Sequence, residues 1–386
     1  MNRHFLRDIA DIQTGPYGSQ LHKEDYVDIG TPIVTVEHLG NRVFTEQNLP
    51  KVSDEDKARL SKYVLKEGDI VFSRVGSVDR CSYVDAAHDG WMFSGRCLRV
   101  RPNTEVDPLY LYYFFCLEDT KQFVRNIAVG ATMPSINTKL LGEVEVAYPS
   151  QTEQQKIVAL LSALDDKIEI NQKINDNLQQ QAAALFSSLY DRTNTEVRFT
   201  DLIQILGGGT PKTGENTYWN GNIAFFTPKD VGTPYTLITE KTITEEGLSH
   251  CNSRLYPVNT VFVTARGTVG KVGMSGVPMA MNQSCYALVG KETHQLLVYF
   301  YTLKAVDRLK HKASGAVFDA ITTRDFESEQ IMKLSDDDAK AFLCIAEPMF
   351  QKVLNNCIEN LRLSTLRDSL LPKLMSGEVD VSAVQL

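Results

Sequence analysis

The chain has 386 residues, of which 43% are hydrophobic and 23% charged, and its formal net charge is −8. This length exceeds what one hydrophobic core usually supports, so we expect two domains or more. We find no apolar run that could cross a bilayer and no apolar segment typical of a signal peptide at the N-terminus, which predicts a cytoplasmic protein without a membrane contact. The seven cysteines are odd in number and form no CxxC pair, which argues against a disulfide framework and a zinc site.

The first part of the chain alternates short β-like runs with turns. TPIVTV begins at Thr31 and IVFSRVGSV at Ile70, and a helix-like stretch follows over residues 107–127. Gly, Pro, Asn and Asp punctuate these runs, as expected for loops between strands. The pattern predicts an α/β domain over residues 1–149, with a mixed, strongly bent sheet and a few helices.

Residues 150–191 are predicted to form one long helix. Apolar residues and asparagines recur with alternating spacings of four and three, which is the seam of a coiled coil. Ser150 followed by Glu153 fits a capping box at the start of the helix. The seam comprises Ile157, Leu161, Leu164, Ile168, Asn171, Asn175, Leu178, Ala182, Leu185 and Leu189.

The chain then repeats itself. NIAFFTPKDVG resembles the run from Thr31, and VFVTARGTV from Val261 resembles the run from Ile70, with Gly76 and Gly267 in equivalent places. AVGATMPSI from Ala128 likewise matches ASGAVFDAI from Ala313, and we call the difference between these two residue numbers the repeat offset. A repeat this long is a duplicated domain, so we predict a second α/β domain over residues 192–334 and a second long helix over residues 335–386.

The second helix shows the same seam, displaced by the repeat offset. Pro348 lies inside it, which predicts a kink or a late helix start, and Pro372 is expected to end or bend the last turn. Arg367 occupies a seam position and must reach a partner or a helix end. The seam positions are Phe342, Ala346, Met349, Val353, Asn356, Asn360, Leu363, Arg367, Leu370 and Leu374, and the cap is Ser335 with Asp338.

The duplication predicts a pseudo-twofold fold in which two similar α/β (α+β) domains are joined by two long antiparallel helices. A twofold axis near the middle of the seam would place Asn171 and Asn175 opposite Asn356 and Asn360. Buried asparagines in a seam specify helix register at some cost in stability. The alternative is that these asparagines face water on a weakly amphipathic helix.

The sequence offers little sign of catalysis. We find no adenine-methyltransferase motif, no dinucleotide-binding motif and no phosphate loop, and the glycine-rich GGGTPKTG is interpreted as a turn. Asp165, Asp166 and Lys167 have the composition of a nuclease site, but their place on the helix predicts a solvated polar face. The seven histidines show no ligand spacing, so no catalytic and no metal-binding residue is assigned.

The turns of both domains carry Arg, Lys, Asn and Gln side chains that suit DNA bases and phosphates. An ordinary exposed loop is the alternative for each of them. The acidic total charge does not decide the matter, because DNA affinity depends on where the basic residues lie. The candidate DNA-binding residues are Ser19, Gln20, Lys23, His38, Arg42, Arg74, Ser77, Arg80, Thr210, Lys212, Tyr218, Lys229, Arg266, Thr268, Lys271, Asn282 and Gln283.

Three stretches resemble the specificity subunits of type I restriction-modification systems. YPSQTEQQKIVALLSALDDKIEINQKINDN looks like their central region, LRDSLLPKLMSGEVDV like their C-terminal region, and GGGTPKTGENTYWNGNIAFFTPKDVG like one of their target-recognition domains. The resemblance implies that each domain reads one half of a split sequence in double-stranded DNA, with the helices as a ruler. It also implies two methyltransferase subunits and a restriction or motor subunit as partners. S-adenosylmethionine would be held by the methyltransferase and no cofactor by this chain.

Two other functions remain open at this point. A standalone enzyme would turn over substrate without a partner, and a coiled-coil scaffold with two generic ligand-binding domains would show no dependence on DNA. A DNA-recognition subunit predicts sequence-specific protection of DNA once the methyltransferase and its cofactor are supplied.

Overall fold

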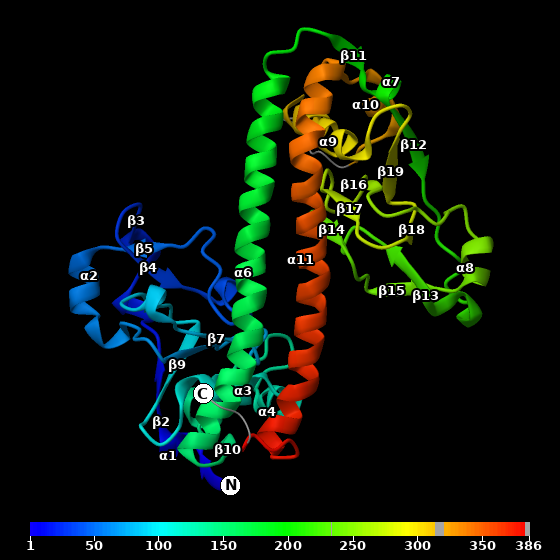
Figure 1. The fold of residues 1–386 in the computed structure, drawn as a ribbon. Helices are drawn as coiled ribbons and strands as arrows, with labels where there is room; N and C mark the ends of the chain where they lie inside the picture. Colours follow the sequence, from blue (N-terminus) through cyan, green and yellow to red (C-terminus); the bar gives the residue numbers. More distant parts are fainter. Residues whose placement is uncertain (233, 313–319, 383–386) are drawn as a thin grey trace. The chain divides into compact units, whose positions relative to one another are not determined.

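A computed structural model describes residues 1–232, 234–312 and 320–382 (Figure 1). The side chains of Ser19 and Lys23 and most of the predicted repeat ASGAVFDAI lie outside this description. The chain divides into two compact units. Unit 1 comprises Met1–Lys167 and Leu363–Leu386, and unit 2 comprises Ile168–Arg362. None of the described helices combines the length and the hydropathy needed to span a membrane.

Unit 1 contains two four-stranded sheets and a strand pair. One sheet has the order β2-β9-β6-β7, the other β3-β5-β4-β8, and β1 pairs with β10. The strands are β1 (Asn2–Phe5), β2 (Ala10–Thr14), β3 (Tyr26–Val27), β4 (Thr31–Val34), β5 (Lys51–Val52), β6 (Ile70–Ser73), β7 (Cys81–Tyr83), β8 (Met92–Phe93), β9 (Cys97–Pro102) and β10 (Glu145–Tyr148). The shorter helices are α1 (Leu6–Ile9), α2 (Asp54–Arg59), α3 (Pro108–Cys116), α4 (Glu118–Ile127) and α5 (Thr138–Leu141).

Unit 2 repeats this plan with one more strand in the larger sheet. Its sheets have the orders β12-β19-β16-β17-β14 and β15-β13-β18, and β11 pairs with β20. The strands are β11 (Glu196–Arg198), β12 (Ile203–Gly207), β13 (Trp219–Phe226), β14 (Tyr235–Thr236), β15 (Lys241–Ile243), β16 (Val261–Thr264), β17 (Val272–Ser275), β18 (Met279–Met281), β19 (Cys285–Gly290) and β20 (Gln330–Met332). The shorter helices are α7 (Phe199–Leu202), α8 (Glu245–Ser249), α9 (Gln295–Lys312) and α10 (Thr323–Ser328).

Equivalent strands of the two units have equivalent pairings, which confirms the predicted duplication. The parallel pair β4–β8 corresponds to the parallel pair β13–β18, and the antiparallel pair β6–β9 corresponds to β16–β19. Mixed pairing was expected from the sequence. The prediction of one strongly bent sheet was wrong, because the strands are short and divide between two sheets in each unit.

The long helices are α6 (Gln151–Tyr190) and α11 (Asp336–Ser376). Both predicted caps are present. The Ser150 backbone N–H donates to Glu153 Oε2 at 3.1 Å, and the Asp338 N–H donates to Ser335 Oγ at 3.1 Å. Neither proline ends or delays α11, so the predicted late start at Pro348 and the predicted end at Pro372 were wrong. Both prolines lie on the exposed side of the helix, where water can bond the carbonyl groups that lose a donor.

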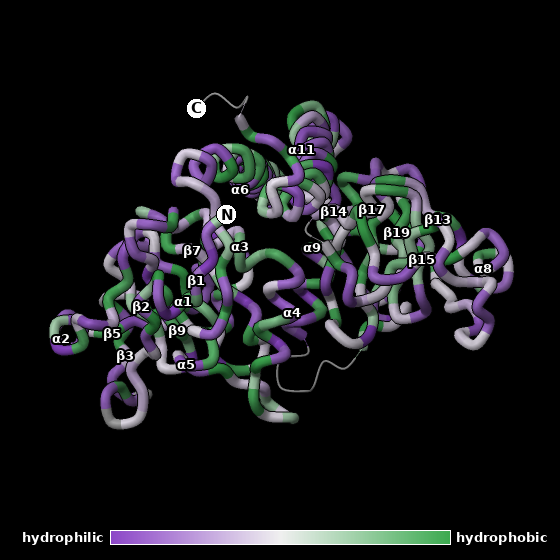
Figure 2. The backbone as a smooth tube through the Cα atoms, turned by 90° about the horizontal axis from the view of Figure 1, so that it is seen from below, coloured by the Kyte–Doolittle hydropathy of each residue, from purple (hydrophilic) through white to green (hydrophobic). Residues whose placement is uncertain are grey.

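In each unit one part of α6 packs antiparallel against one part of α11. In unit 1, Ile157 and Leu161 share a core with Leu371 and Leu374. In unit 2, Phe186 contacts Phe342 with ring centroids 5.4 Å apart. Both helices mix hydrophobic and hydrophilic residues along their length (Figure 2). The predicted seams are the buried side of these helices, because every predicted seam residue is buried or half-buried.

The four seam asparagines lie opposite one another in unit 2. Asn171 Nδ2 donates to Asn360 Oδ1 at 2.9 Å, and Asn356 Nδ2 donates to Asn175 Oδ1 at 2.8 Å. Both Asn171 and Asn356 are fully buried, which rules out the alternative that they face water. Their role in fixing the register stays a prediction.

Asp165 does not lie on a solvated face, so that prediction was wrong. Its carboxylate is 7% exposed, accepts a hydrogen bond from the Tyr113 hydroxyl at 2.7 Å and pairs with Arg367 at 2.7 Å. Burial lowers the pKa of the Arg367 guanidinium, but the bond to Asp165 outweighs this and raises the pKa above its usual value. The neighbouring Asp166 is 54% exposed and pairs with Arg42 at 2.5 Å.

Candidate DNA interface

Four loops of unit 2 meet where strands of both sheets end. The Asn282 N–H donates to the Phe226 carbonyl at 3.0 Å, and the Ala265 N–H donates to the Ser284 carbonyl at 2.8 Å. Thr210 Oγ1 donates to Gln283 Oε1, which brings a fourth loop to the same place. We call this set the four-loop edge of unit 2; its loops are residues 208–210, 227–230, 265–271 and 282–284.

Unit 1 builds the same edge from equivalent residues. The Ser94 N–H donates to the Val34 carbonyl at 2.8 Å, and the Arg74 N–H donates to the Arg96 carbonyl at 2.8 Å. These bonds correspond one to one with the two backbone bonds of unit 2. The four-loop edge of unit 1 consists of residues 15–20, 35–38, 74–80 and 94–96.

One loop shows why the sequence repeat includes a glycine. The Ser73 N–H bonds the Arg80 carbonyl at 2.9 Å, and the Thr264 N–H bonds the Lys271 carbonyl at 3.0 Å, so both loops close over the same number of residues. Gly76 and Gly267 have φ angles of 76° and 81°, a conformation that glycine adopts without strain. The loop geometry is therefore shared, while the side chains around the glycine differ.

Basic side chains are exposed at both edges although the whole chain is acidic. Arg80 in unit 1 and Arg266 and Lys271 in unit 2 are exposed. Lys229 is also exposed and lies 3.5 Å from Glu240, a distance that leaves it only weakly neutralised. The local charge therefore suits a polyanion despite the net charge of −8.

Amide and hydroxyl side chains complete the predicted set at the edges. Ser77, Thr268 and Gln283 are exposed, and Arg74 and Thr210 are half-buried. Thr268 Oγ1 also donates to the Pro228 carbonyl at 3.3 Å, and an Arg74 guanidinium nitrogen donates to the Gly95 carbonyl at 3.2 Å. The structure thus brings most of the predicted residues of each domain to one edge.

His38 has a structural role, which corrects its place among the DNA-binding candidates. It is 1% exposed, its Nδ1 accepts from the Thr35 N–H at 3.0 Å, and its Nε2 lies 3.1 Å from the Gln47 carbonyl. In unit 2 the carboxylate of Asp230 occupies the same position, where it accepts from the Thr227 N–H at 2.8 Å. Each side chain holds its turn closed, so His38 is unavailable to DNA in this conformation.

Three further candidates are bonded within the chain. Gln20 Oε1 accepts from the Tyr63 hydroxyl at 2.7 Å, and Asn282 Oδ1 accepts from the Ser284 N–H at 3.0 Å. Arg42 is half-buried and bonded to Asp166 on α6. The Asn282 and Gln20 bonds shape the loops, and the Arg42 pair ties a loop of unit 1 to its long helix.

Lys212 and Tyr218 lie away from the edge. The Lys212 carbonyl accepts from the Trp219 indole at 3.3 Å, and Trp219 begins β13, whose other end leads to the edge. Tyr218 stacks on His250 with ring centroids 4.9 Å apart. The structure therefore does not bring these two residues together with the other candidates of their domain.

Two exposed residues of the unit 1 edge were missed from the sequence. Arg96 is exposed beside Arg74, and Tyr17 is 63% exposed next to Gly95. The signal for Arg96 was the match of SGRC with NQSC, which places Cys97 and Cys285 at equivalent strand starts. Tyr17 gave no signal, because a tyrosine in a loop is not distinctive by itself.

Among the described residues, no three or more His, Cys, Asp or Glu side chains are arranged to hold a metal ion. The two edges instead offer guanidinium, ammonium and amide donors on loops that a repeated scaffold positions. Such an arrangement defines a class of protein: a DNA-recognition protein with two similar reading domains in one chain.

Comparisons with known proteins identify the family. Residues 2–180 and 192–333 match the family described as type I restriction modification DNA specificity domain. The MjaIX type I restriction enzyme specificity subunit of Methanocaldococcus jannaschii is 24% identical, over 97% of this chain and 93% of the relative. The HindI specificity subunit of Haemophilus influenzae is also 24% identical, over 84% of this chain and 89% of the relative.

A solved structure supports the fold. The S subunit of a type I restriction-modification system from M. genitalium has a TM-score of 0.59 at 17% identity, covering 97% of this chain and 95% of that chain. The chain belongs to the type I restriction-modification DNA specificity family, and its role is that of a DNA-recognition subunit.

Proposed function

We propose that the chain reads an asymmetric, bipartite target in double-stranded DNA, with one half-site at each four-loop edge. The observation that carries this proposal is that the two edges share their backbone bonds but differ in their side chains. Arg74 and Arg96 of unit 1 correspond to Ala265 and Ser284 of unit 2. Equal scaffolds with unequal side chains should select unequal half-sites.

The exposed side chains divide into two kinds of contact. The Arg80 and Arg266 guanidiniums can pair bidentately with guanine, and the Gln283 amide can pair with adenine. The Lys229 and Lys271 ammonium groups suit phosphates, which set position more than sequence. Replacing a base-reading arginine should relax the selection at one position, whereas replacing a lysine should weaken binding to all sequences.

The long helices are proposed to set the spacing between the half-sites. Each contains residues of both units and is unbroken, and 40 residues of α6 extend over about 60 Å. Inserting about one helical turn into both seams should lengthen the unread spacer between the half-sites. An unchanged spacer would remove the role of the helices as a ruler.

We propose that catalysis resides in partner subunits. Two methyltransferase subunits, which would hold S-adenosylmethionine, and a restriction or motor subunit would assemble on this non-catalytic chain in the cytoplasm. The proposed division of the chain is residues 1–149 and 192–334 as reading domains and residues 150–191 and 335–386 as the helices on which partners assemble.

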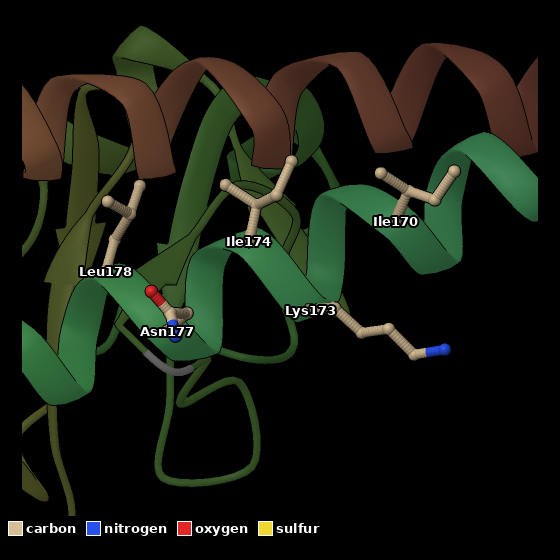
Figure 3. Close-up of a pocket in the computed structure, with 5 residues that line it drawn as sticks. All are labelled: Ile170, Lys173, Ile174, Asn177 and Leu178. Carbon is tan, nitrogen blue, oxygen red and sulfur yellow. The ribbon is translucent and has the colours of Figure 1, made fainter.

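One exposed apolar stripe on α6 fits a contact with a methyltransferase subunit. Ile170 is 52% exposed and Ile174 is 37% exposed, and with Leu178 they line one side of the helix (Figure 3). Apolar side chains spaced four residues apart form a continuous surface that is unfavourable in water. The double change Ile170→Asp and Ile174→Asp should abolish co-purification of the methyltransferase but leave the helix folded. Lys173→Asp, whose side chain points away from the stripe in Figure 3, is the matched control.

The test of the proposed function is a genome-wide map of methylated bases in cells with and without this gene. The proposal predicts one bipartite motif with different halves that disappears when the gene is deleted. A map that does not change, or a palindromic motif, would contradict it.

A further inference from the structure

The loop between α4 and α5 in unit 1 has an ordered, apolar tip. The N–H groups of Val129 and Ser135 each donate to the carbonyl of the other, both at 2.9 Å, which closes the loop at its base. Gly130 has a φ angle of 110°, so the chain turns sharply directly after Val129. The loop is therefore held in shape by its own backbone rather than by core packing.

This loop lies against the four-loop edge of unit 1. The Gly76 N–H donates to the Pro134 carbonyl at 2.8 Å, and the Ile136 N–H donates to the Arg74 carbonyl at 2.9 Å. Gly76 belongs to the loop that carries Ser77 and Arg80. A duplex bound at the edge would therefore meet the tip of the apolar loop as well as the basic side chains.

Two apolar side chains of the loop face solvent. Met133 is 67% exposed and Val129 is 63% exposed. Exposed apolar residues are common one at a time, but two on a braced loop beside basic side chains call for a ligand with an apolar interior. The stacked bases of a duplex offer such an interior, and methionine is one of the residues that proteins insert between base pairs.

We propose that Met133 is a wedge that enters the base stack of the half-site read by unit 1. This inference rests on the proposed function. The sequence repeat gives independent support, because adding the repeat offset to Met133 leads to Phe318, which is also a large apolar residue. Insertion would unstack one base step, and burial of the methionine side chain would offset the loss of stacking. Selection at this step would then depend on how easily the step deforms rather than on hydrogen bonds.

The experiment uses the complex of this chain with its methyltransferase subunits and a duplex that carries the mapped target. 2-Aminopurine, whose fluorescence rises on unstacking, replaces one base of the unit 1 half-site at a time. The wild-type complex should raise the fluorescence at one base step. Met133→Ser should abolish the rise and weaken binding about tenfold or more, whereas Met133→Leu should retain both.

A second duplex separates a wedge from a general structural role. A mismatch at the responsive step removes most of the stacking in advance, so it should reduce the loss caused by Met133→Ser to less than about threefold. Ile29→Ser is the matched control, because Ile29 is 90% exposed and precedes the start of β4 rather than following its end at the edge. It should leave binding unchanged.

Three results would overturn the wedge. These are no fluorescence rise at any step with the wild type, equal affinity of wild type and Met133→Ser, or a loss of methyltransferase binding in place of DNA affinity. Failure of the wild-type complex to prefer its mapped target over other DNA would instead contradict the proposed function. The two failures are therefore distinguishable.

Discussion

The buried ion pair on the long helices can be tested against its counterpart in the other unit. In unit 1, Asp165 is enclosed by Tyr113 and Arg367. The repeat offset, which also separates Ser150 from Ser335, pairs Asp165 with Phe350 and Arg367 with Ala182 of unit 2. Both of these residues are buried there in a hydrophobic core. The repeat thus contains a polar and an apolar solution to the same packing problem.

Tyr113 also has an apolar counterpart. Asp107 bonds the Leu109 N–H at the start of α3, and His294 bonds the Leu296 N–H at the start of α9, which aligns Tyr113 with Phe300. The Phe300 and Phe350 rings are 5.5 Å apart. The set Phe, Phe and Ala is therefore known to pack in this fold.

The single change Arg367→Ala should destabilise unit 1 by about 2–3 kcal/mol. Removing one partner leaves the other charge buried without compensation, which costs about 3–5 kcal/mol for a fully buried pair. The lower value applies because the Arg367 side chain is 30% exposed and partly screened. The triple change Tyr113→Phe, Asp165→Phe and Arg367→Ala should restore stability to within about 1 kcal/mol of the wild type.

Urea unfolding measures both effects. The chain has two tryptophans, Trp91 in unit 1 and Trp219 in unit 2, so Trp219→Phe leaves Trp91 as the reporter of unit 1. Asp368→Ala is the control, because Asp368 bonds Arg367 at 2.8 Å but is 64% exposed, and it should cost less than about 0.5 kcal/mol. The reasoning is refuted if Arg367→Ala is as stable as the wild type, or if the triple variant is less stable than the single variant.

Three further predictions concern buried polar groups. Changing Asn171 and Asn356 to Leu should keep or raise the free energy of unfolding by up to about 2 kcal/mol, because each has a buried Oδ1 without a hydrogen-bond partner among the described residues, while cysteine crosslinking should detect more than one helix register. His38→Ala should lower the free energy of unfolding by about 1–2 kcal/mol, whereas His38→Asp, which copies the turn of unit 2, should lower it less. Burial raises the pKa of the Cys97 and Cys285 thiols to about 12, so the stability that these protonated thiols provide should decline above about pH 8.5, by about 1.4 kcal/mol per thiol for each pH unit.

Each of these predictions has a control. A single crosslinked register in the leucine variant would contradict the role of the asparagines. Equal losses for His38→Ala and His38→Asp would show that the turn does not depend on a side-chain acceptor. Stability that does not change between about pH 8.5 and about pH 10 would contradict the pKa values of the buried thiols, and Cys97→Ala and Cys285→Ala variants should show a flatter pH profile than the wild type.

The long helices and the duplication were predictable because their signals are local or repeated. The spacing of the seam residues and the caps at Ser150 and Ser335 depend on residues within a few turns of one another. The repeat offset then located the second helix from the first. The matching runs also placed Gly76 and Gly267 at equivalent turns, where both have the expected left-handed backbone.

The environment of single polar residues was not predictable in the same way. Asp165 is polar and seemed to belong to a solvated face, but its partner Arg367 lies 202 residues away and Tyr113 comes from another helix. His38 was assigned to DNA because histidine in a turn suits a polar ligand. Its burial depends on Gln47 and on the close packing of the loop, which no short pattern records.

The central claim is that each unit reads one half of the DNA target independently. The most direct measurement is a methylation map from cells in which residues 1–149 are exchanged for the first domain of another family member. The account predicts a new motif in which one half changes while the other half and the spacer stay the same. A motif in which both halves change would contradict it.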